Sequence, residues 1–269
     1  MAKILVTGGN GVLGQAVSKL FLSNNTNFLI ASRNQKAKTY DNNNAASHLN
    51  LKWNYMDLSK KEGLNKSVNN DIDTILHLAS IHIQKIDGQP GDIILTKNLL
   101  DSIQKKNIKH FVYISIVGID KIPFPYYKAK LECEHLIKAS GIPYTILRAT
   151  QFHDFVDFVA SKLLKFPITI VPKSFKVQPI QVEAVAMELD KIIKESPLNS
   201  TYDIGGKKIY NMKEIMDSLL KIRHENKLIL NMPAISNVIK GFIKGYNTCG
   251  NISLNSNTWE EYLSKKYLK

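Results

Sequence analysis

Tyr126 and Lys130 are the residues of this sequence whose types and spacing offer the clearest chemistry. If a helix carries them, a spacing of four residues places both side chains on one face. An ammonium group near a phenol lowers the pKa of the phenol, so tyrosine can exchange a proton with a carbonyl or hydroxyl group near neutral pH. A serine hydroxyl, here that of Ser115, can polarise the substrate oxygen. The three residues predict acid/base catalysis, although this tyrosine–lysine spacing also arises by chance in a lysine-rich chain.

Glycines at positions 8, 9, 11 and 14 form the second chemical feature. They follow an aliphatic run, and apolar residues then recur at helical spacing from Val12 to Phe21. The pattern predicts a strand, a tight turn and a helix, since glycine permits positive φ angles and leaves no Cβ in the way of a ligand. The amides and the positive dipole end of this helix favour an anion such as a pyrophosphate. A glycine-rich turn in another kind of α/β protein is the alternative.

Arg33 stands where the next strand, predicted over 28–32, ends. In a dinucleotide-binding fold, the residue about twenty positions beyond the glycines meets the adenosine ribose. An acid there selects NAD, whereas an arginine accommodates the 2′-phosphate of NADP. Ser32 precedes Arg33, and Lys36 and Lys38 follow it. The sequence therefore favours NADP(H) over NAD(H), the alternative being that Arg33 is an ordinary solvated residue at a strand end.

Strands and helices are expected to alternate along the first half of the chain. Further strands are predicted at 49–56, 72–79 and 110–115. The run 72–79 is almost entirely apolar, as in a central parallel strand buried on both faces. His77 within it is expected to be a hydrogen-bonded core residue rather than a catalyst. The alternation predicts an α/β fold with a parallel, doubly wound sheet.

The second half of the chain carries weaker patterns. Short strands are predicted at 168–171 and 175–177, and a helix is predicted over 235–243. Asn211 with Glu214 three residues later forms a capping-box pattern at the start of another helix. Since no internal repeat or linker is evident, we expect one continuous body.

Several motifs together resemble one enzyme family. Thr7-Gly8-x-x-Gly11-x-x-Gly14, Ser115, the pair Tyr126 and Lys130, and the stretch 130–148 are similar to those of short-chain dehydrogenase/reductases. Within that family the chain resembles the atypical, NmrA-like NAD(P)H-binding group, over roughly residues 3–210. The resemblance implies a Rossmann-type doubly wound sheet with a small C-terminal substrate lobe. It places an NAD(P)-binding core at 1–150 and a substrate-binding lobe, partly interleaved with it, at 151–269.

The resemblance also implies roles for individual residues. Tyr126 would be the acid/base, Lys130 would orient the nicotinamide ribose and tune Tyr126, and Ser115 would assist. Asp57 and Leu58 would border the adenine ring, while Leu78 and Ala79 would let the cofactor ribose lie close. The complete predicted cofactor set is Thr7, Gly8, Gly11, Val12, Leu13, Gly14, Ser32, Arg33, Asp57, Leu58, Leu78, Ala79 and Lys130.

The composition of the chain restricts which cell compartments and which partners we expect. The 269 residues contain two isolated cysteines, which form neither a disulfide framework nor a zinc site. We expect a cytoplasmic protein without membrane insertion, because no apolar run reaches transmembrane length and no signal peptide precedes the first strand. The net charge of +13 is spread along the chain, so we expect no nucleic-acid partner. A monomer or a homodimer is expected.

These patterns favour an NADP(H)-preferring oxidoreductase that transfers hydride to or from a small carbonyl, quinone or related substrate. A non-catalytic NADP(H)-binding sensor or regulatory protein, as in the NmrA group, is the principal alternative. An epimerase or lyase that retains its cofactor is a third interpretation. The sequence does not name the substrate, because no motif marks the substrate-binding residues.

Overall fold

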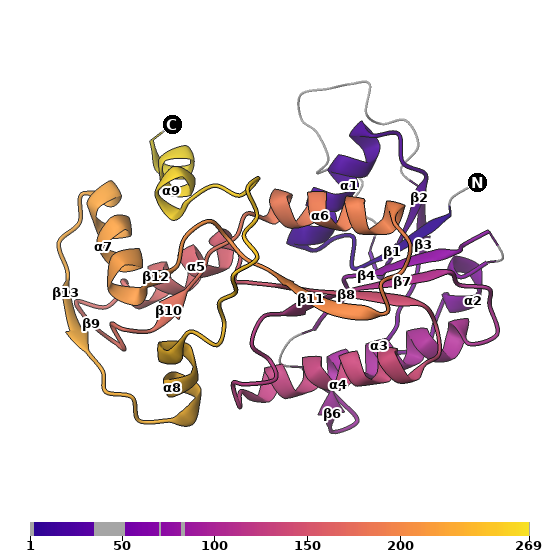
Figure 1. The fold of residues 1–269 in the computed structure, drawn as a ribbon, viewed down its shortest axis with the longest axis horizontal. Coiled ribbons are helices and arrows are strands. Elements are labelled where there is room, and N and C mark those ends of the chain that lie inside the picture. The colour runs from indigo at the N-terminus through magenta and orange to yellow at the C-terminus, as the bar shows by residue number, and fades with distance from the viewer. Residues whose placement is uncertain (1–2, 35–51, 70, 82–83, 269) are drawn as a thin grey trace. The chain divides into compact units, whose positions relative to one another are not determined.

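The computed structural model describes residues 3–34, 52–69, 71–81 and 84–268 (Figure 1). Its main sheet has seven strands in the order β11-β8-β7-β4-β1-β2-β3. The registers of β1 with β2 and β4, of β2 with β3, and of β4 with β7 are parallel. The strands are β1 (Ile4–Thr7), β2 (Phe28–Ser32), β3 (Lys52–Tyr55), β4 (Thr74–His77), β7 (His110–Ile116), β8 (Tyr144–Ala149) and β11 (Ser200–Ile204).

The strand order reverses at β1, because β2 and β3 lie on one side of it and β4, β7 and β8 on the other. This is the doubly wound arrangement, and the predicted fold class is confirmed. In such sheets a ligand binds outside the carboxyl ends of the strands at the reversal point. Thr7 ends β1 and His77 ends β4, so the residues after them are placed where a cofactor is expected.

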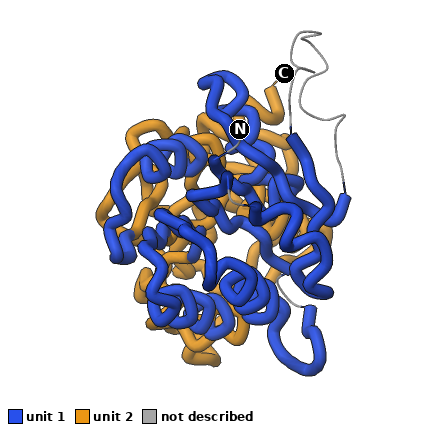
Figure 2. The backbone as a smooth tube through the Cα atoms, turned by 90° about the vertical axis from the view of Figure 1, so that its right-hand side faces the viewer, with its two compact units in different colours: residues 1–115, 128–147, 185–202 blue, residues 116–127, 148–184, 203–269 orange. Residues whose placement is uncertain are grey.

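The chain divides into two compact units (Figure 2). Unit 1 comprises residues 1–115, 128–147 and 185–202, and unit 2 comprises 116–127, 148–184 and 203–269. The predicted division near residue 150 into a cofactor core and a substrate lobe stays a prediction.

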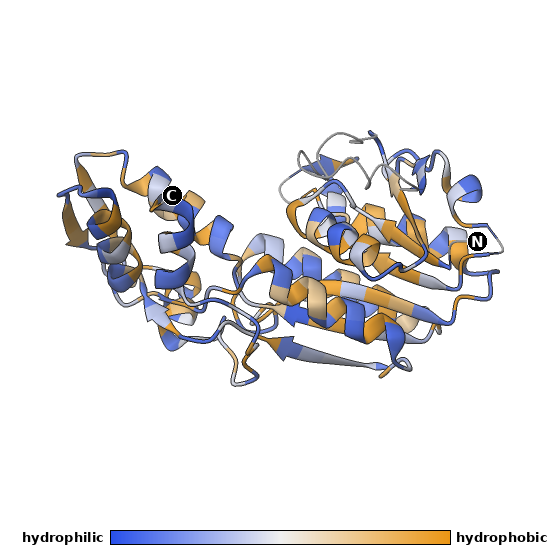
Figure 3. Cartoon of the chain, turned by 90° about the horizontal axis from the view of Figure 1, so that it is seen from above, coloured by the Kyte–Doolittle hydropathy of each residue, from blue (hydrophilic) through white to orange (hydrophobic). Residues whose placement is uncertain are grey.

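Unit 1 holds most of the sheet and the helices that cover it. The inner strands β1, β2 and β4 are buried almost throughout, whereas β3 and β11 carry polar and partly exposed residues. The helices are banded by hydropathy because only one side of each meets the sheet (Figure 3). One core layer packs Leu5, Ile75 and Phe111 of the sheet with Leu99 and Ile103. Its helices are α1 (Val12–Ser23), α2 (Leu64–Ser67), α3 (Gly91–Ile103), α4 (Pro125–Ala139) and α6 (Val182–Lys194), of which α4 and α6 begin in unit 2. Strand β5 (Lys85–Ile86) pairs with β6 (Gln89–Pro90).

Unit 2 has its own core, in which Trp259 is fully buried with Tyr210, Ile215 and Leu219. The predicted capping box is confirmed, since Asn211 and Glu214 bond each other's backbone amides at the start of α7. Its helices are α5 (His153–Leu163), α7 (Met212–Arg223), α8 (Asn237–Lys244) and α9 (Trp259–Tyr267). Its strands are β9 (Ile168–Val171), β10 (Lys176–Val177), β12 (Tyr210–Asn211) and β13 (Leu228–Asn231).

Most element predictions are confirmed, some with the predicted bounds and others with bounds that differ by a few residues. The strand predicted over 49–56 is β3, and its residues 49–51 lie outside the described residues. The helix predicted over 235–243 is α8, whereas β13 has no counterpart among the predictions. In the described part of the chain, no helix combines the length and the apolar character needed to cross a membrane.

Candidate cofactor and catalytic site

The glycine turn after β1 is packed directly against the residues that follow β4. Gly8 has a φ of +73°, and a Cβ at this position would lie 2.5 Å from the amide nitrogen of Ala79. A Cβ on Gly14 would lie 2.4 Å from the Gly8 carbonyl oxygen. Neither site has room for a side chain, because both close contacts are with backbone atoms. The two glycines therefore bring β1, α1 and the end of β4 together.

Helix α1 begins with amides that are available to an anion. The Gly11 amide donates to the Gly8 carbonyl at 3.0 Å, which closes the turn, and the helix starts at Val12. Gly11 has no side chain to cap the helix, and the first turn contains no acidic residue. The first amides of a helix have no acceptor within it, so these face outward with the positive end of the dipole. Val12 is 61% exposed beside them, whereas Leu13 is buried.

Ser32 joins the turn to β3 through its hydroxyl group. It accepts from Asn10 Nδ2 at 3.1 Å and from Trp53 Nε1 at 2.8 Å, and it donates to the Asn34 carbonyl at 2.8 Å. A serine hydroxyl offers one proton and two lone pairs, so its capacity is fully used. Sequence reasoning missed Asn10 and Trp53, since neither belongs to the glycine pattern.

Arg33 is exposed and lies close enough to Asp57 for its charge to act on that carboxylate. Burial alone would raise the pKa of Asp57, but hydrogen bonds from the amide and hydroxyl of Ser59 lower it, and Arg33 lowers it further. The net effect holds the pKa of Asp57 below its usual value, so this side chain is ionised at neutral pH. Lys36 and Lys38, which were predicted to add positive charge, lie outside the described residues.

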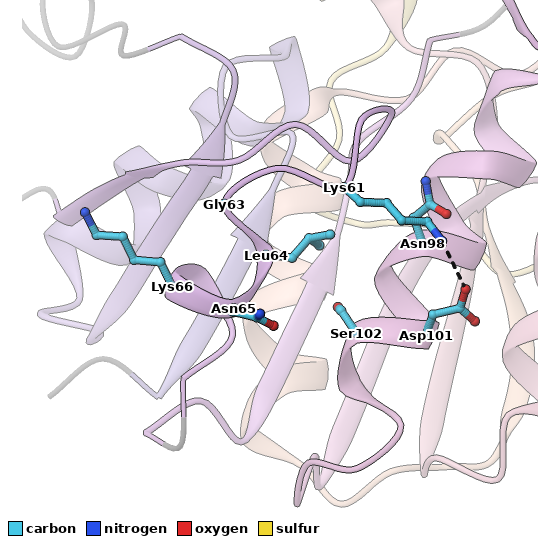
Figure 4. A pocket seen from close by; sticks show the side chains of 8 residues that line it. All are labelled: Lys61, Gly63, Leu64, Asn65, Lys66, Asn98, Asp101 and Ser102. Atoms are coloured by element: carbon cyan, nitrogen blue, oxygen red, sulfur yellow. Dashed lines mark ion pairs between the residues drawn. The ribbon is translucent and has the colours of Figure 1, made fainter.

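Asn98 of α3 fixes the backbone at Leu58, because its Nδ2 donates to the Leu58 carbonyl at 2.7 Å. Asn98 also lines a hollow of about 440 Å³ (Figure 4). An ion pair of 3.8 Å between Lys61 and Asp101 crosses one side of it. The other lining residues are Gly63, Leu64, Asn65, Lys66 and Ser102. None of these residues belongs to the predicted cofactor set, but Asn98 connects the hollow to Leu58, which does.

The ends of β1 and β4 are connected by a buried histidine. His77 Nδ1 lies 2.7 Å from Thr7 Oγ1, and His77 Nε2 lies 3.3 Å from Thr96 Oγ1. Burial, with a smaller contribution from Lys130, lowers the pKa of His77 to about 3, so the ring is neutral. The Thr7 hydroxyl also accepts from the Ala79 amide at 3.4 Å, so it links His77 to the residues that follow β4. His77 is the hydrogen-bonded core residue that the sequence predicted.

Lys130 lies in the core of unit 1 with its ammonium group fully engaged. Its Nζ donates to the Ile114 carbonyl at 3.1 Å, lies 3.8 Å from Asp92 Oδ2, and stands 4.4 Å above the centre of the Tyr113 ring. Burial lowers the pKa of Lys130, and Asp92 opposes that shift. The buried carboxylate therefore helps to keep the lysine charged.

Asp92 is a site residue that sequence reasoning missed. It is 2% exposed in the first turn of α3, where it accepts from Ser80 Oγ at 2.7 Å and from the Ile81 amide at 2.8 Å. In sequence, an acid in a first helical turn indicates only an interaction with the helix dipole. Its partner Lys130 is in another helix, and no local pattern connects the two.

The remaining predicted catalytic residues lie on separate elements. Tyr126 is in the first turn of α4, partly exposed, one helical turn before Lys130. The neighbouring Tyr127 is buried, and burial raises its pKa to about 12 although Gln151 opposes the shift. Ser115 is 3% exposed near the end of β7, and its hydroxyl has no hydrogen-bond partner among the residues that the structure describes. These roles stay predictions.

Comparison with protein families supports the cofactor interpretation. A family model described as NAD(P)H-binding matches residues 8–195, which include the glycine turn and Lys130. The photosystem II assembly factor Ycf39 of Trieres chinensis is 23% identical over 242 residues, covering 86% of this chain and 72% of that protein. The divinyl chlorophyllide a 8-vinyl-reductase of Arabidopsis thaliana is 25% identical over 256 residues. That match covers 86% of this chain but only 60% of the reductase.

Solved structures show the same fold at low sequence identity. The NADPH-dependent quinone oxidoreductase QOR2 of Escherichia coli, in complex with NADPH, matches with a TM-score of 0.78 and 17% identity. That match covers 98% of this chain and 99% of the other. The triphenylmethane reductase of Citrobacter sp. matches with a TM-score of 0.76 and 17% identity, over 99% of this chain and 100% of the other.

Proposed function

This chain belongs to the NAD(P)H-binding family, and we propose that it is an NADP(H)-preferring oxidoreductase of the atypical short-chain type. It transfers hydride to or from a small carbonyl, quinone or related substrate. The observation that supports the cofactor most directly is the turn, in which Gly8 and Gly14 have no room for a side chain and α1 begins uncapped. These residues fit a pyrophosphate, since backbone amides and a helix dipole are what such an anion requires.

The cofactor residues divide by function. The amides of Val12 and Leu13 bind the pyrophosphate, and Arg33 binds the 2′-phosphate. Ser32 positions Asn10 and Trp53 rather than the phosphate, because its hydroxyl already makes three hydrogen bonds.

The adenine side and the ribose side complete the cofactor site. Asp57 and Leu58 border the adenine, and Asn98 fixes that segment through its hydrogen bond to the Leu58 carbonyl. Leu78 and Ala79 flank the ribose, since the Gly8 contact and the Thr7 hydroxyl fix their backbone.

The bound nicotinamide supplies or accepts the hydride, and the protein supplies the proton. Tyr126 donates its phenolic proton to the substrate oxygen on reduction and recovers one from it on oxidation. Lys130 favours the phenolate electrostatically from the next helical turn, because its charge is retained with the help of Asp92. The Ser115 hydroxyl, which lacks another partner among the described residues, polarises the substrate oxygen.

A non-catalytic NADP(H)-binding sensor is the second candidate. The observation that favours it is the position of Lys130, whose ammonium group is held by Ile114, Asp92 and the Tyr113 ring. A lysine committed to the core in this way stabilises the fold without contacting a cofactor or a substrate.

A nucleotide titration tests the cofactor assignment. NADPH is expected to bind more tightly than NADH, and Arg33→Asp is expected to weaken NADPH binding by roughly 10- to 100-fold, the effect of losing a charged hydrogen-bonding partner. The exposed Lys19 on α1 provides the control, because Lys19→Glu changes the net charge equally. Equal affinity of the wild type for both nucleotides would contradict the preference for NADP(H).

Turnover then separates the two candidate functions. In a screen of carbonyl and quinone acceptors, Tyr126→Phe is expected to lower kcat by at least about 100-fold while leaving NADPH affinity unchanged. The exposed Tyr246 offers a matched control, Tyr246→Phe. Full activity of Tyr126→Phe would remove the catalytic assignment, and tight NADPH binding without turnover of any acceptor would favour the sensor.

A further inference from the structure

Unit 2 exposes four aliphatic side chains on one face of a small sheet. Strands β9 and β13 pair in parallel, with Ile168 opposite Leu228 and Ile170 opposite Leu230 (Figure 1). The exposed fractions of these side chains are 52%, 56%, 58% and 41%, in that order. We call these four residues the aliphatic face. Cross-strand neighbours in this register lie together, so the face is a single apolar patch.

The opposite face of the same two strands already packs against the core of unit 2. Thr169 and Val171 are buried, and Ile229 is packed against that core. A sheet with one face on a core normally presents polar residues on the other. Aliphatic residues on both faces therefore indicate that the outer face has a partner of its own.

The two chain segments that contain these strands carry basic residues but no acidic ones. The segments 158–182 and 226–259, which contain the two strands, carry seven lysines and no aspartate or glutamate. Lys165 and Lys173 flank β9, and Lys227 directly precedes β13. The Lys173 amide donates to Asn231 Oδ1 at 3.0 Å, so the ends of the two strands meet beside that lysine. The nearest acid in sequence is Glu225, two residues before Lys227.

We infer that the aliphatic face binds the surface of an anionic lipid membrane. The four side chains would enter the boundary between headgroups and acyl chains, and the lysines would contact lipid phosphates. Protein interfaces are instead enriched in aromatic residues and arginine and depleted of lysine. Four partly exposed side chains also provide only a fraction of the roughly 800 Å² that each partner contributes to a standard protein interface. Charge and chemistry thus favour a lipid surface over a second copy of this chain.

Flotation with vesicles tests the inference. The full-length protein is expected to float with vesicles of phosphatidylcholine and phosphatidylglycerol mixed three to one, and not with phosphatidylcholine alone. Ile170→Ser with Leu230→Ser is expected to weaken partitioning at least about tenfold, because apolar area is lost. Lys173→Gln with Lys227→Gln is expected to weaken it by about fivefold per lysine. Added salt is expected to weaken the wild type, since it screens the lysines.

Two matched pairs of exposed residues in unit 1 control for charge and hydropathy. Met187→Ser with Leu198→Ser removes similar apolar exposure, and Lys97→Gln with Lys105→Gln removes equal charge. Both control proteins are expected to float like the wild type. Failure of the wild type to float with anionic vesicles overturns the inference, as does equal loss in the controls. A concentration-dependent dimer that Ile170→Ser with Leu230→Ser abolishes, without vesicle binding, would identify a second copy as the partner instead.

Discussion

The two units each bury a histidine, and they compensate for its burial in different ways. In unit 1, both ring nitrogens of His77 lie near threonine hydroxyls. In unit 2, the His153 ring lies against those of Trp259 and Tyr262, with ring centres 6.1 Å and 5.0 Å away, and these two rings also contact each other at 5.4 Å. Neither nitrogen of His153 makes a hydrogen bond of normal geometry among the described residues.

The difference shows what each ring contributes. Hydrogen bonds fix His77 in one orientation and thereby fix Thr7, next to the glycine turn. Stacking fixes only the plane of His153, so another flat ring could take its place. We therefore expect hydrogen bonding to determine which side chains can replace His77. At His153, we expect the flat shape of the ring to determine it.

The largest expected effect is shared by His77, His153 and a third buried histidine, His110 of unit 1. Burial lowers the pKa of His77 to about 3 and those of His110 and His153 to about 4. These folded-state values lie below the unfolded value of about 6.5, so the unfolded chain binds more protons as the pH falls. Stability is therefore complete above about pH 6.5 and is lost as the pH falls toward about 4, at about 2 kcal/mol per histidine by pH 5.

Urea unfolding at about pH 7 and about pH 5 measures this loss. The three histidines together predict a decrease of about 6 kcal/mol in the free energy of unfolding. The decrease is smaller if the native state relaxes and binds protons itself. Unchanged stability between the two pH values would show that these rings are not buried in solution.

The second effect concerns the buried ion pair near His77. Asp92→Asn leaves the Lys130 ammonium without its carboxylate in a site where both are nearly inaccessible. Removing one charged partner of a buried ion pair lowers the free energy of unfolding by about 3–5 kcal/mol. The introduced amide would retain part of the hydrogen bonding. We expect a loss of about 3 kcal/mol in urea unfolding at neutral pH.

Another ion pair on α3 supplies the control for Asp92→Asn. Asp101 pairs with Lys61 at the same distance of 3.8 Å, but the two side chains are 53% and 60% exposed. Asp101→Asn is expected to change the free energy of unfolding by less than about 1 kcal/mol, because water screens exposed pairs. Similar losses in the two variants would mean that Lys130 reaches water.

Local features were predictable from the sequence, and the polar contacts around the site were not. The glycine turn, the alternation of strands and helices and the Asn211–Glu214 cap each follow from short-range chemistry. The pair of Asp92 and Lys130, by contrast, joins two helices that only the completed sheet brings together.

The pairing of β9 with β13 could not be predicted from the sequence either. The two strands are separated by the whole of α6, β11 and α7, so neither their parallel register nor the aliphatic face could be predicted. Burial of His77 was predictable, because an apolar central strand surrounds it, but its two threonine partners come from other elements.

The third prediction separates the two histidines. His77→Phe keeps the ring volume but removes the partners of Thr7 and Thr96, which leaves buried hydroxyls with fewer hydrogen bonds. The expected loss of stability is about 2 kcal/mol, with weaker NADPH binding because Thr7 no longer holds the Ala79 backbone beside Gly8. Urea unfolding and the NADPH titration measure the two effects. A stable variant with normal NADPH affinity would show that the threonines find other partners.

The smallest expected change comes from His153→Phe, and it tests the comparison most sharply. Phenylalanine keeps the stack with Trp259 and Tyr262 while removing two buried nitrogens that lack partners of normal geometry. At neutral pH we expect the free energy of unfolding to stay within about 1 kcal/mol of the wild type, or to rise, because no hydrogen bond of normal geometry is broken.

At about pH 5 the same variant should be more stable than the wild type by about 2 kcal/mol, since it no longer has this ring to protonate on unfolding. A loss at neutral pH as large as that of His77→Phe would mean that His153 makes polar contacts in solution. The two units would then compensate for a buried histidine in the same way, by hydrogen bonding, and the stack would be secondary.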